Sequence, residues 1–397
     1  MIGLINLRKP VNCLPWKVRS ELNTDRKINV LQITEGLGWA GAEKKLWELV
    51  HRMDPERFNT LICNFGMGDF YPEQLDALGL RYVTLKRGGQ FDVSLIWRLR
   101  ELIRREKIDV IMSTLFHADL MGALVGKWAG AKAVFSWETI SSPHWLIPRR
   151  LYPYRVAIKN VDRVISVSQA TAKWLHEERG VSPRQIEVIP YGVDLERFVK
   201  RPDPALRREL GIPEKAPVIG MVARLQPQKG HIYLFEAALS IIKEAPDVRF
   251  VLVGGGPDTD TLKARVKEMG LDACFHFLGY RDDVPRLLGM FDIFTLPSLF
   301  EGLPNVVLEA MSCSLPVVAT PVDGTKEAVV PDVTGILVPE KSPAPLADAL
   351  LKLLKNPGLA KSMGDEGRKR VEDHFSLRMQ VERFQNLYTR FTFGRKV

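Results

Sequence analysis

The stretch INVLQITEGLGWAGAEKKLWELVHRM, residues 28–53, contains one complete strand–turn–helix unit. Residues 28–34 are rich in Ile, Val and Leu, which predicts a buried strand. Small residues dominate the turn at 35–43, and apolar residues then recur at helical spacing through residues 44–53. A buried strand followed by an amphipathic helix is the repeating unit of parallel sheets, so this segment predicts an α/β fold.

The same unit recurs along the rest of the chain. Further strand-like runs lie at residues 58–65, 108–114, 131–137, 161–168, 218–225, 248–256, 274–280, 291–298 and 315–321. Helical patterns separate these runs, and a charged, proline-rich segment at 199–216 divides them into two sets. Two doubly wound, Rossmann-like domains in series place a ligand cleft between the carboxyl ends of their strands.

These patterns predict a particular division of the chain. The parts are an extension at 1–27, a first domain at 28–198, a linker at 199–216, a second domain at 217–375 and a C-terminal helical segment at 376–397. The apolar face of the last segment suits packing on either domain, including a crossing back to the first.

Composition excludes several classes of protein. The chain has 397 residues, of which 46% are hydrophobic and 26% charged, as in ordinary globular proteins. It contains no run of 18 apolar residues, and its first 20 residues lack the pattern of a signal peptide. The four cysteines are scattered without a C-x-x-C pair, which argues against a zinc site and favours reduced thiols in the cytoplasm.

The positive charge is concentrated in the first half of the chain. Residues 1–200 hold 30 Lys and Arg against 22 Asp and Glu, a net charge of +8, whereas the remainder has a net charge of +1. An excess of this kind suits a phosphorylated acceptor or an anionic membrane surface, and it equally serves solubility. No nucleic-acid-binding module accompanies the charge, so we expect no nucleic-acid partner.

Two cations follow the first strand of the second domain. In VARLQPQKG, Arg224 ends the strand and Lys229 lies five residues later. An Arg fork and a Lys point charge at the carboxyl end of a strand suit a diphosphate, although two solvated loop charges would give the same pattern.

A glycine-rich turn follows the next strand in VLVGGGPDTDTL. Three glycines before a helix allow close backbone approach, but they are a weak signal by themselves. Asp258 and Asp260 resemble part of a metal site. We interpret Asp258 as a helix N-cap, because it precedes an amphipathic helix.

The segment LFEGLPNVVLEAMSC, residues 299–313, places Glu301 and Glu309 in an otherwise apolar stretch. Pro304 suits the start of a helix, whose first N–H groups would form an anion site. Glu309 lies about two turns into that helix, so the two carboxylates cannot bind one small group. They could hold opposite ends of a long ligand such as a nucleotide sugar; the alternative is that each makes a local cap or salt bridge.

In combination, these motifs resemble the retaining glycosyltransferases of family GT4, which have the GT-B fold. Glu301 and Glu309 have the spacing of the E-x7-E motif of that family, and VARLQPQKG is similar to its Arg/Lys diphosphate clamp. DRVISVSQATAKWL, VIPYGVDLERF, FLGYRDDVPRLL and VDGTKEAVVPDVTGILVP are similar to further family blocks, so the resemblance runs from about residue 28 to about residue 375.

The resemblance implies roles for individual residues. The residues with implied catalytic roles are Arg224 and Lys229 on the leaving diphosphate, Glu301 on the donor sugar, and His117 of LFHADL near that sugar. The residues with implied donor-binding roles are Glu309 on the ribose, Gly302, Leu303, Pro304, Asn305 and Val306 in the phosphate loop, Gly41 of WAGAE, and Tyr280 and Arg281 near the nucleobase. Ala40 stands where the family has the first glycine of G-G-A-E.

We therefore expect a retaining hexosyltransferase that uses a UDP-, GDP- or ADP-sugar and needs neither metal nor cofactor. Its acceptor would be a glycan or a lipid-linked molecule of bacterial cell-surface polysaccharide, lipopolysaccharide or glycolipid synthesis. The segment 141–155 contains Trp145, Arg149 and Arg150, a mixture that suits an acceptor or an anionic membrane, although an ordinary helix with a solvated basic face would give the same pattern. We expect a cytoplasmic protein, which is peripheral on the membrane if this segment binds lipid. The alternatives are a nucleotide-sugar 2-epimerase of the same fold and a non-catalytic nucleotide-sugar-binding subunit.

Overall fold

The computed structural model describes residues 26–394, except 37–40, 68–71 and 90–91. Most of the predicted extension at 1–27 and Ala40 of the WAGAE loop lie outside the described residues. Within the described ranges, no helix is long and apolar enough to cross a membrane.

The first half of the chain forms a seven-stranded sheet in the order β3-β2-β1-β4-β5-β6-β7, in which every neighbouring pair is parallel. Its strands are β1 (Ile28–Thr34), β2 (Phe58–Asn64), β3 (Tyr82–Thr84), β4 (Val110–Thr114), β5 (Ala133–Glu138), β6 (Arg163–Ser166) and β7 (Ile186–Val188). Its helices are α1 (Gly41–Arg52), α2 (Pro72–Ala77), α3 (Ser94–Arg105), α4 (Phe116–Ala129), α5 (Pro148–Ala157) and α6 (Gln169–Glu177), with short 3-10 helices η1 (Pro143–Leu146), η2 (Ile158–Asn160) and η3 (Pro183–Gln185).

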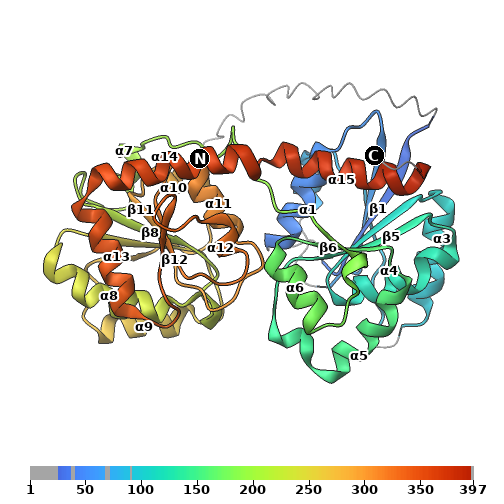
Figure 1. The fold of residues 1–397 in the computed structure, drawn as a ribbon, viewed down its shortest axis with the longest axis horizontal. Helices are drawn as coiled ribbons and strands as arrows, with labels where there is room; N and C mark the ends of the chain where they lie inside the picture. Colours follow the sequence, from blue (N-terminus) through green and yellow to red (C-terminus); the bar gives the residue numbers. More distant parts are fainter. Residues whose placement is uncertain (1–25, 37–40, 68–71, 90–91, 395–397) are drawn as a thin grey trace, which may run out of the picture.

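The second half forms a six-stranded parallel sheet in the order β10-β9-β8-β11-β12-β13. Its strands are β8 (Val218–Val222), β9 (Arg249–Val253), β10 (Phe275–Phe277), β11 (Ile293–Leu296), β12 (Val317–Ala319) and β13 (Gly335–Leu337). Its helices are α7 (Pro204–Glu209), η4 (Pro227–Lys229), α8 (His231–Glu244), α9 (Thr259–Glu268), α10 (Val284–Leu288), α11 (Asn305–Ser312), α12 (Thr325–Ala328), α13 (Pro343–Lys355) and α14 (Pro357–His374). Figure 1 shows the two sheets, each with its own helices, side by side.

The fold class is the predicted one: two doubly wound α/β domains. The sequence analysis did not predict β3, β7 and β13, three edge strands of three residues each that contain partly exposed residues. Helix α9 begins after Asp258, as expected, but the side chain of Asp258 makes no capping hydrogen bond; the Thr259 hydroxyl instead donates to the Gly256 carbonyl.

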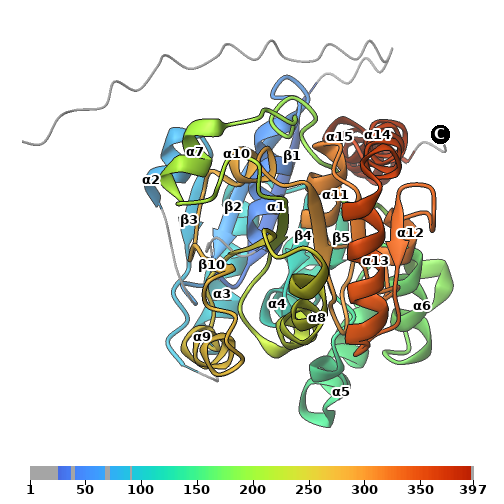
Figure 2. The same ribbon diagram turned by 90° about the vertical axis from the view of Figure 1, so that its left-hand side faces the viewer.

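The last helix, α15 (Leu377–Phe393), packs on the first domain although it follows the second in the chain. In Figure 1, α14 lies over the second domain and α15 continues in the same direction over the first domain; Figure 2 shows the two helices one behind the other. The ring of Tyr388 stacks on Phe135 at 6.0 Å, and its hydroxyl accepts a hydrogen bond from the Gln32 side chain. The helix therefore joins the two domains through buried side chains as well as through the chain.

A polar cluster is buried inside the first domain, where most neighbours are apolar. Asp119 accepts hydrogen bonds from the hydroxyls of Ser113 and Ser136, at 2.7 and 2.8 Å. Glu138 pairs with Arg179, whose guanidinium lies 3.3 Å from the centre of the Tyr154 ring. Burial, reinforced by the charge of Glu138, raises the pKa of Asp119 to about 7 against the opposing hydroxyl bonds.

This cluster predicts a pH-dependent stability. The folded pKa of Asp119 lies above its unfolded value of 3.8, so its contribution to the free energy of unfolding is lost as the pH rises toward about 7. We expect the urea midpoint to fall between about pH 5 and about pH 7, and Asp119→Asn to reduce that slope by up to about 1.4 kcal/mol per pH unit. The exposed Asp348→Asn is the matched control. Parallel pH profiles for Asp119→Asn and the wild type would contradict the assignment.

Candidate active site

The loops at the carboxyl ends of the two sheets touch across the gap between the domains. The backbone of Ile140, after β5, forms an antiparallel bridge with that of Gly302, after β11. The Ser168 hydroxyl, after β6, donates to the Gly302 carbonyl at 3.2 Å. A Cβ atom at Gly302 would lie 2.1 Å from the Thr139 carbonyl oxygen, so only glycine permits this approach.

A second contact closes the same side of the gap. The carboxylate of Glu327, on α12, accepts hydrogen bonds from the backbone N–H groups of Gln169 and Ala170 at 2.9 and 2.7 Å. One domain thus caps the N-terminus of helix α6 in the other, a favourable position for a carboxylate.

Two helix N-termini meet inside the cleft. Helix α1 begins at Gly41 and α11 begins at Asn305, directly after Leu303 and Pro304. A Cβ atom at Gly41 would lie 3.8 Å from the side-chain nitrogen of Asn305. Because the first N–H groups of a helix have no partner inside it, this junction suits an anion.

The second domain adds its cations and a carboxylate beside this junction. The Lys229 ammonium and the Ser298 hydroxyl both donate to Oε1 of Glu301, at 2.6 and 2.7 Å. The Glu301 carboxylate is buried, and its backbone N–H donates to Asp323 at 2.8 Å. The structure therefore fixes Lys229 and Glu301 as one unit, which the sequence analysis treated as separate groups.

Arg224 lies exposed at the carboxyl end of β8. In the part of the chain that the structure describes, its guanidinium makes no hydrogen bond or ion pair. Burial raises the pKa of Glu43, in the first turn of α1, and the charge of Arg224 opposes that rise across the cleft. Arg224 thus faces the first turn of α1 with its donors available to a ligand.

Glu309 is 4% exposed on α11 and lies 3.7 Å from the ammonium of Lys44 on α1. Glu309 therefore forms a salt bridge, as the alternative interpretation of the sequence predicted, but its partner Lys44 belongs to the other domain. The buried carboxylate is compensated, and Lys44 is a further cation of the cleft that sequence analysis missed.

The first domain contributes a paired histidine. The backbone N–H and the Nδ1 of His117 lie 2.7 and 2.9 Å from Oε1 of Glu35, directly after β1. Burial would raise the pKa of Glu35, but the hydrogen bonds from His117, helped by the charge of Arg150, hold it below its usual range. Glu35 fixes the orientation of His117; its only sequence signal was its position directly after a strand end.

The three residues predicted to contact the acceptor or a membrane do not lie together in the structure. Trp145 stacks on Phe116 with ring centres 6.1 Å apart, and the Arg150 guanidinium lies 5.0 and 5.6 Å from the two ring centres. Trp145 and Arg150 therefore lie beside the Glu35–His117 pair, whereas Arg149 is exposed. The sequence analysis did not identify Phe116 as a residue of the site, because an aromatic residue in an apolar stretch cannot be distinguished from a residue of the hydrophobic core.

The predicted base-binding residues lie at the edge of the second sheet, in the loop after β10. The Arg281 guanidinium makes two hydrogen bonds to Asp283, at 2.8 and 2.7 Å. Tyr280 is 59% exposed. Gly302, Leu303 and Pro304 are buried, and Val306 is half-buried in the first turn of α11.

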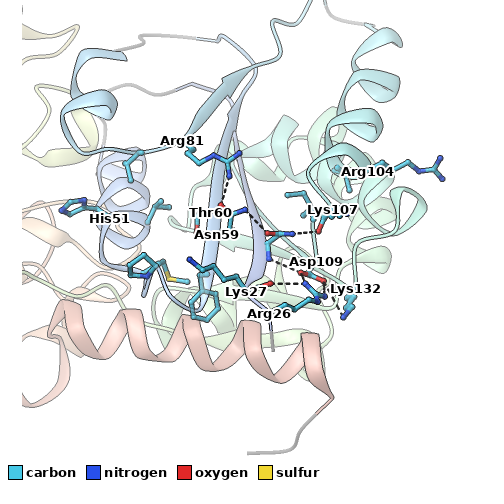
Figure 3. A pocket seen from close by; sticks show the side chains of 18 of the residues that line it. Arg26, Lys27, His51, Asn59, Thr60, Arg81, Arg104, Lys107, Asp109 and Lys132 are labelled. Carbon is cyan, nitrogen blue, oxygen red and sulfur yellow. Dashed lines mark hydrogen bonds and ion pairs between the residues drawn. The ribbon is translucent and has the colours of Figure 1, made fainter. Parts of the chain in front are cut away.

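A large cavity lies away from this cleft. It encloses about 1000 Å³ at the amino ends of β1 and β2 and is lined by residues of the first domain (Figure 3). The cavity lies at the opposite end of the strands from the cleft, so it is separate from the cleft residues described above. Among the described residues, no group of three or more His, Cys, Asp or Glu could hold a metal ion.

Comparisons with known families identify the family of the chain. The family model for Glycosyl transferases group 1 matches residues 202–370, and that for Glycosyltransferase Family 4 matches residues 39–197. The UDP-Gal:alpha-D-GlcNAc-diphosphoundecaprenol alpha-1,3-galactosyltransferase of Escherichia coli is 30% identical over 92% of this chain and 98% of its own. The N-acetyl-alpha-D-glucosaminyl L-malate synthase of Bacillus anthracis is 26% identical over 89% and 93%.

Solved structures give the same fold. Anabaena HepE in complex with UDP superposes with a TM-score of 0.82 at 22% identity, covering 91% of this chain and 100% of that one. The two facing parallel sheets have the GT-B fold. The chain belongs to glycosyltransferase family 4.

The contact at Gly302 predicts the effect of a single methyl group. We expect Gly302→Ala to separate the two backbones, because its Cβ would overlap the Thr139 carbonyl. The melting temperature should fall by several degrees, and small-angle X-ray scattering should show a larger radius of gyration. The control is Gly358→Ala, whose Cβ would meet nothing within 4 Å. A Gly302→Ala protein with wild-type scattering would refute the role of this contact.

Proposed function

We propose that this glycosyltransferase transfers a hexose-type sugar from a nucleoside-diphosphate sugar to a lipid-linked or glycan acceptor, with retention of the anomeric configuration and without a metal ion. The domain at 217–375 would bind the donor and that at 28–198 the acceptor. We place the reaction in bacterial cell-surface glycan synthesis, on the cytoplasmic side of the membrane.

The observation that carries the proposal is the meeting of α1 and α11 beside Arg224 and Lys229. Two helix N-termini lie close to two cations. Glu301, in the loop before α11, and Glu309, on α11, lie on either side of them, and their carboxylates can accept hydrogen bonds from sugar hydroxyls. A diphosphate in the middle and a hexose at Glu301 would satisfy each of these groups. Glu309, already paired with Lys44, would hold the ribose.

The chemistry then follows from charge. As the bond between the anomeric carbon and the diphosphate breaks, negative charge grows on the phosphate oxygens, where Arg224, Lys229 and the helix termini stabilise it. The acceptor hydroxyl attacks on the same face, and its proton passes to the departing diphosphate. His117, held by Glu35, would orient the sugar, and closure of the domains would exclude water.

The choice of donor and acceptor is supported by the relatives. The name of the Escherichia coli relative contains UDP-Gal and a diphosphate-linked lipid acceptor, and the Anabaena protein binds UDP. We therefore propose a UDP-hexose as donor. The Arg150 guanidinium, mounted on Phe116 and Trp145 at the cleft, would contact an anionic group of the acceptor.

A donor panel tests the activity directly. Release of nucleotide from UDP-, GDP- and ADP-sugars should occur with one donor and be unaffected by EDTA, first alone and then with membrane extract as a source of acceptor. Sensitivity to EDTA would contradict metal independence. Binding of a donor without release of nucleotide would favour a non-catalytic subunit. Inversion of the configuration at C2 of the sugar would favour an epimerase.

Arg224 should act on the transition state. We expect Arg224→Ala to lower kcat by about 10²–10³, as for the loss of one preorganised donor, and Arg224→Lys to recover part of it. The exposed Lys263→Ala in the same domain is the control for surface charge. Sugar transfer by Arg224→Ala at the wild-type rate would exclude the proposed clamp.

Arg150 should act on the acceptor. Arg150→Ala removes a charge-assisted contact, so we expect the KM for a diphosphate-linked acceptor to rise about tenfold more than the KM for the donor. The exposed neighbour Arg149→Ala is the matched control. Equal effects of the two substitutions would contradict the assignment of Arg150 to the cleft.

A further inference from the structure

The loops after β8 and β11 are joined to each other beside the Lys229–Glu301 pair. The two strands are parallel neighbours in the second sheet, so both loops leave the same edge. A Cβ atom at Gly230 would lie 2.0 Å from the Pro297 carbonyl oxygen, and the backbone N–H of Leu299 donates to the Gln228 carbonyl at 2.8 Å. The backbones of the two loops therefore touch next to the residues that form the pair.

The side chain of Gln228 adds a further hydrogen bond between the loops. Its Nε2 donates to the Phe300 carbonyl at 2.7 Å, and its Oε1 accepts from Nε2 of Gln226 at 2.8 Å. Both ends of the amide are thus in use, and the side chain is half-buried. Only an amide carries a donor and an acceptor on a side chain of this length, so neither Glu nor Leu could make both bonds.

The position of this bond in the chain connects it to the candidate active site. Gln228 directly precedes Lys229, and Phe300 directly precedes Glu301. The bond therefore holds together the two backbone segments from which the paired side chains extend. Because a lysine side chain is flexible, the place of its ammonium depends on the anchoring of its backbone.

We propose that Gln228 is a positioning residue, whose side chain sets the spacing of Lys229 and Glu301 and so aligns both with the donor. This role rests on the proposed function, in which Lys229 binds the leaving diphosphate and Glu301 the sugar. A displacement of about 1 Å at a catalytic group can cost about 10² in rate. Loss of the Gln228 bond should therefore slow turnover more than it weakens donor binding.

Gln228→Leu tests this role, because it keeps the size of the side chain and removes both hydrogen bonds. We expect kcat to fall about 10- to 100-fold, with the KM for the donor changed by less than about threefold. The matched control is Gln185→Leu. Gln185 is also half-buried, and its Nε2 donates to the carbonyls of Ile158 and Val161 at 3.2 and 2.9 Å, at the amino ends of β6 and β7. The control should keep the wild-type kcat, and thermal melts show whether both variants are folded.

A double-mutant cycle separates positioning from a general effect on the fold. In a Lys229→Met or Glu301→Gln background, Gln228→Leu should change kcat by less than about twofold, because the pair that it positions is already lost. Additive effects, or a folded Gln228→Leu enzyme with the wild-type kcat, would overturn the positioning role. If Lys229→Met and Glu301→Gln themselves transfer sugar at the wild-type rate, the fault lies in the proposed function.

Hydrogen exchange tests the bond between the loops without any turnover. Gln228→Leu should speed exchange of the backbone amides at residues 298–303 about fivefold, as for the loss of one hydrogen bond, whereas Gln185→Leu should leave them unchanged. Wild-type exchange in this segment of the Gln228→Leu protein would overturn the role of Gln228, whichever donor the enzyme uses.

Discussion

The cleft depends on one backbone contact, between Gly302 and the segment that follows β5. The bridge to Ile140 brings the loop before α11 against the first domain, and the Thr139 carbonyl occupies the space of any side chain at position 302. Because that loop also carries Glu301 and leads into α11, the contact sets how closely α11 approaches α1. The close approach of α11 and Glu301 to the first domain therefore requires the absence of a Cβ atom at position 302.

Parallel topology explains why so many charged groups meet in this place. In both sheets the loops after the strands lie at one edge, and the two edges face each other. Arg224, Glu301 and Glu35 each follow a strand end, so no special folding is needed to gather them. The pairs Lys229–Glu301 and Lys44–Glu309 compensate the buried carboxylates, whereas Arg224 makes no hydrogen bond or ion pair with the residues that the structure describes.

The two faces of the first domain have different chemistry. At the carboxyl edge, Arg150 rests on aromatic rings beside a histidine, which suits recognition of an acceptor. Along α3 and α4, Trp97 and Trp128 are exposed next to a basic cavity. The positive charge of the first half of the chain is thus found both at the cleft and around the cavity. Composition by itself did not distinguish these two places.

The sequence by itself determined the fold class, most strands of both sheets and the two segments that carry Arg224, Lys229, Glu301 and Glu309, because hydrophobic periodicity and strand-end loops are local features. The short edge strands β3, β7 and β13 were missed, since three residues, most of them partly exposed, give little periodic signal. Only the tertiary structure decided that Lys44 reaches Glu309, that Glu35 holds His117 and that Arg150 faces the cleft. These contacts join segments far apart in the chain. Glu35 and His117 meet because β1 and β4 are neighbours in the first sheet, whereas Lys44 reaches Glu309 only because the two domains pack together.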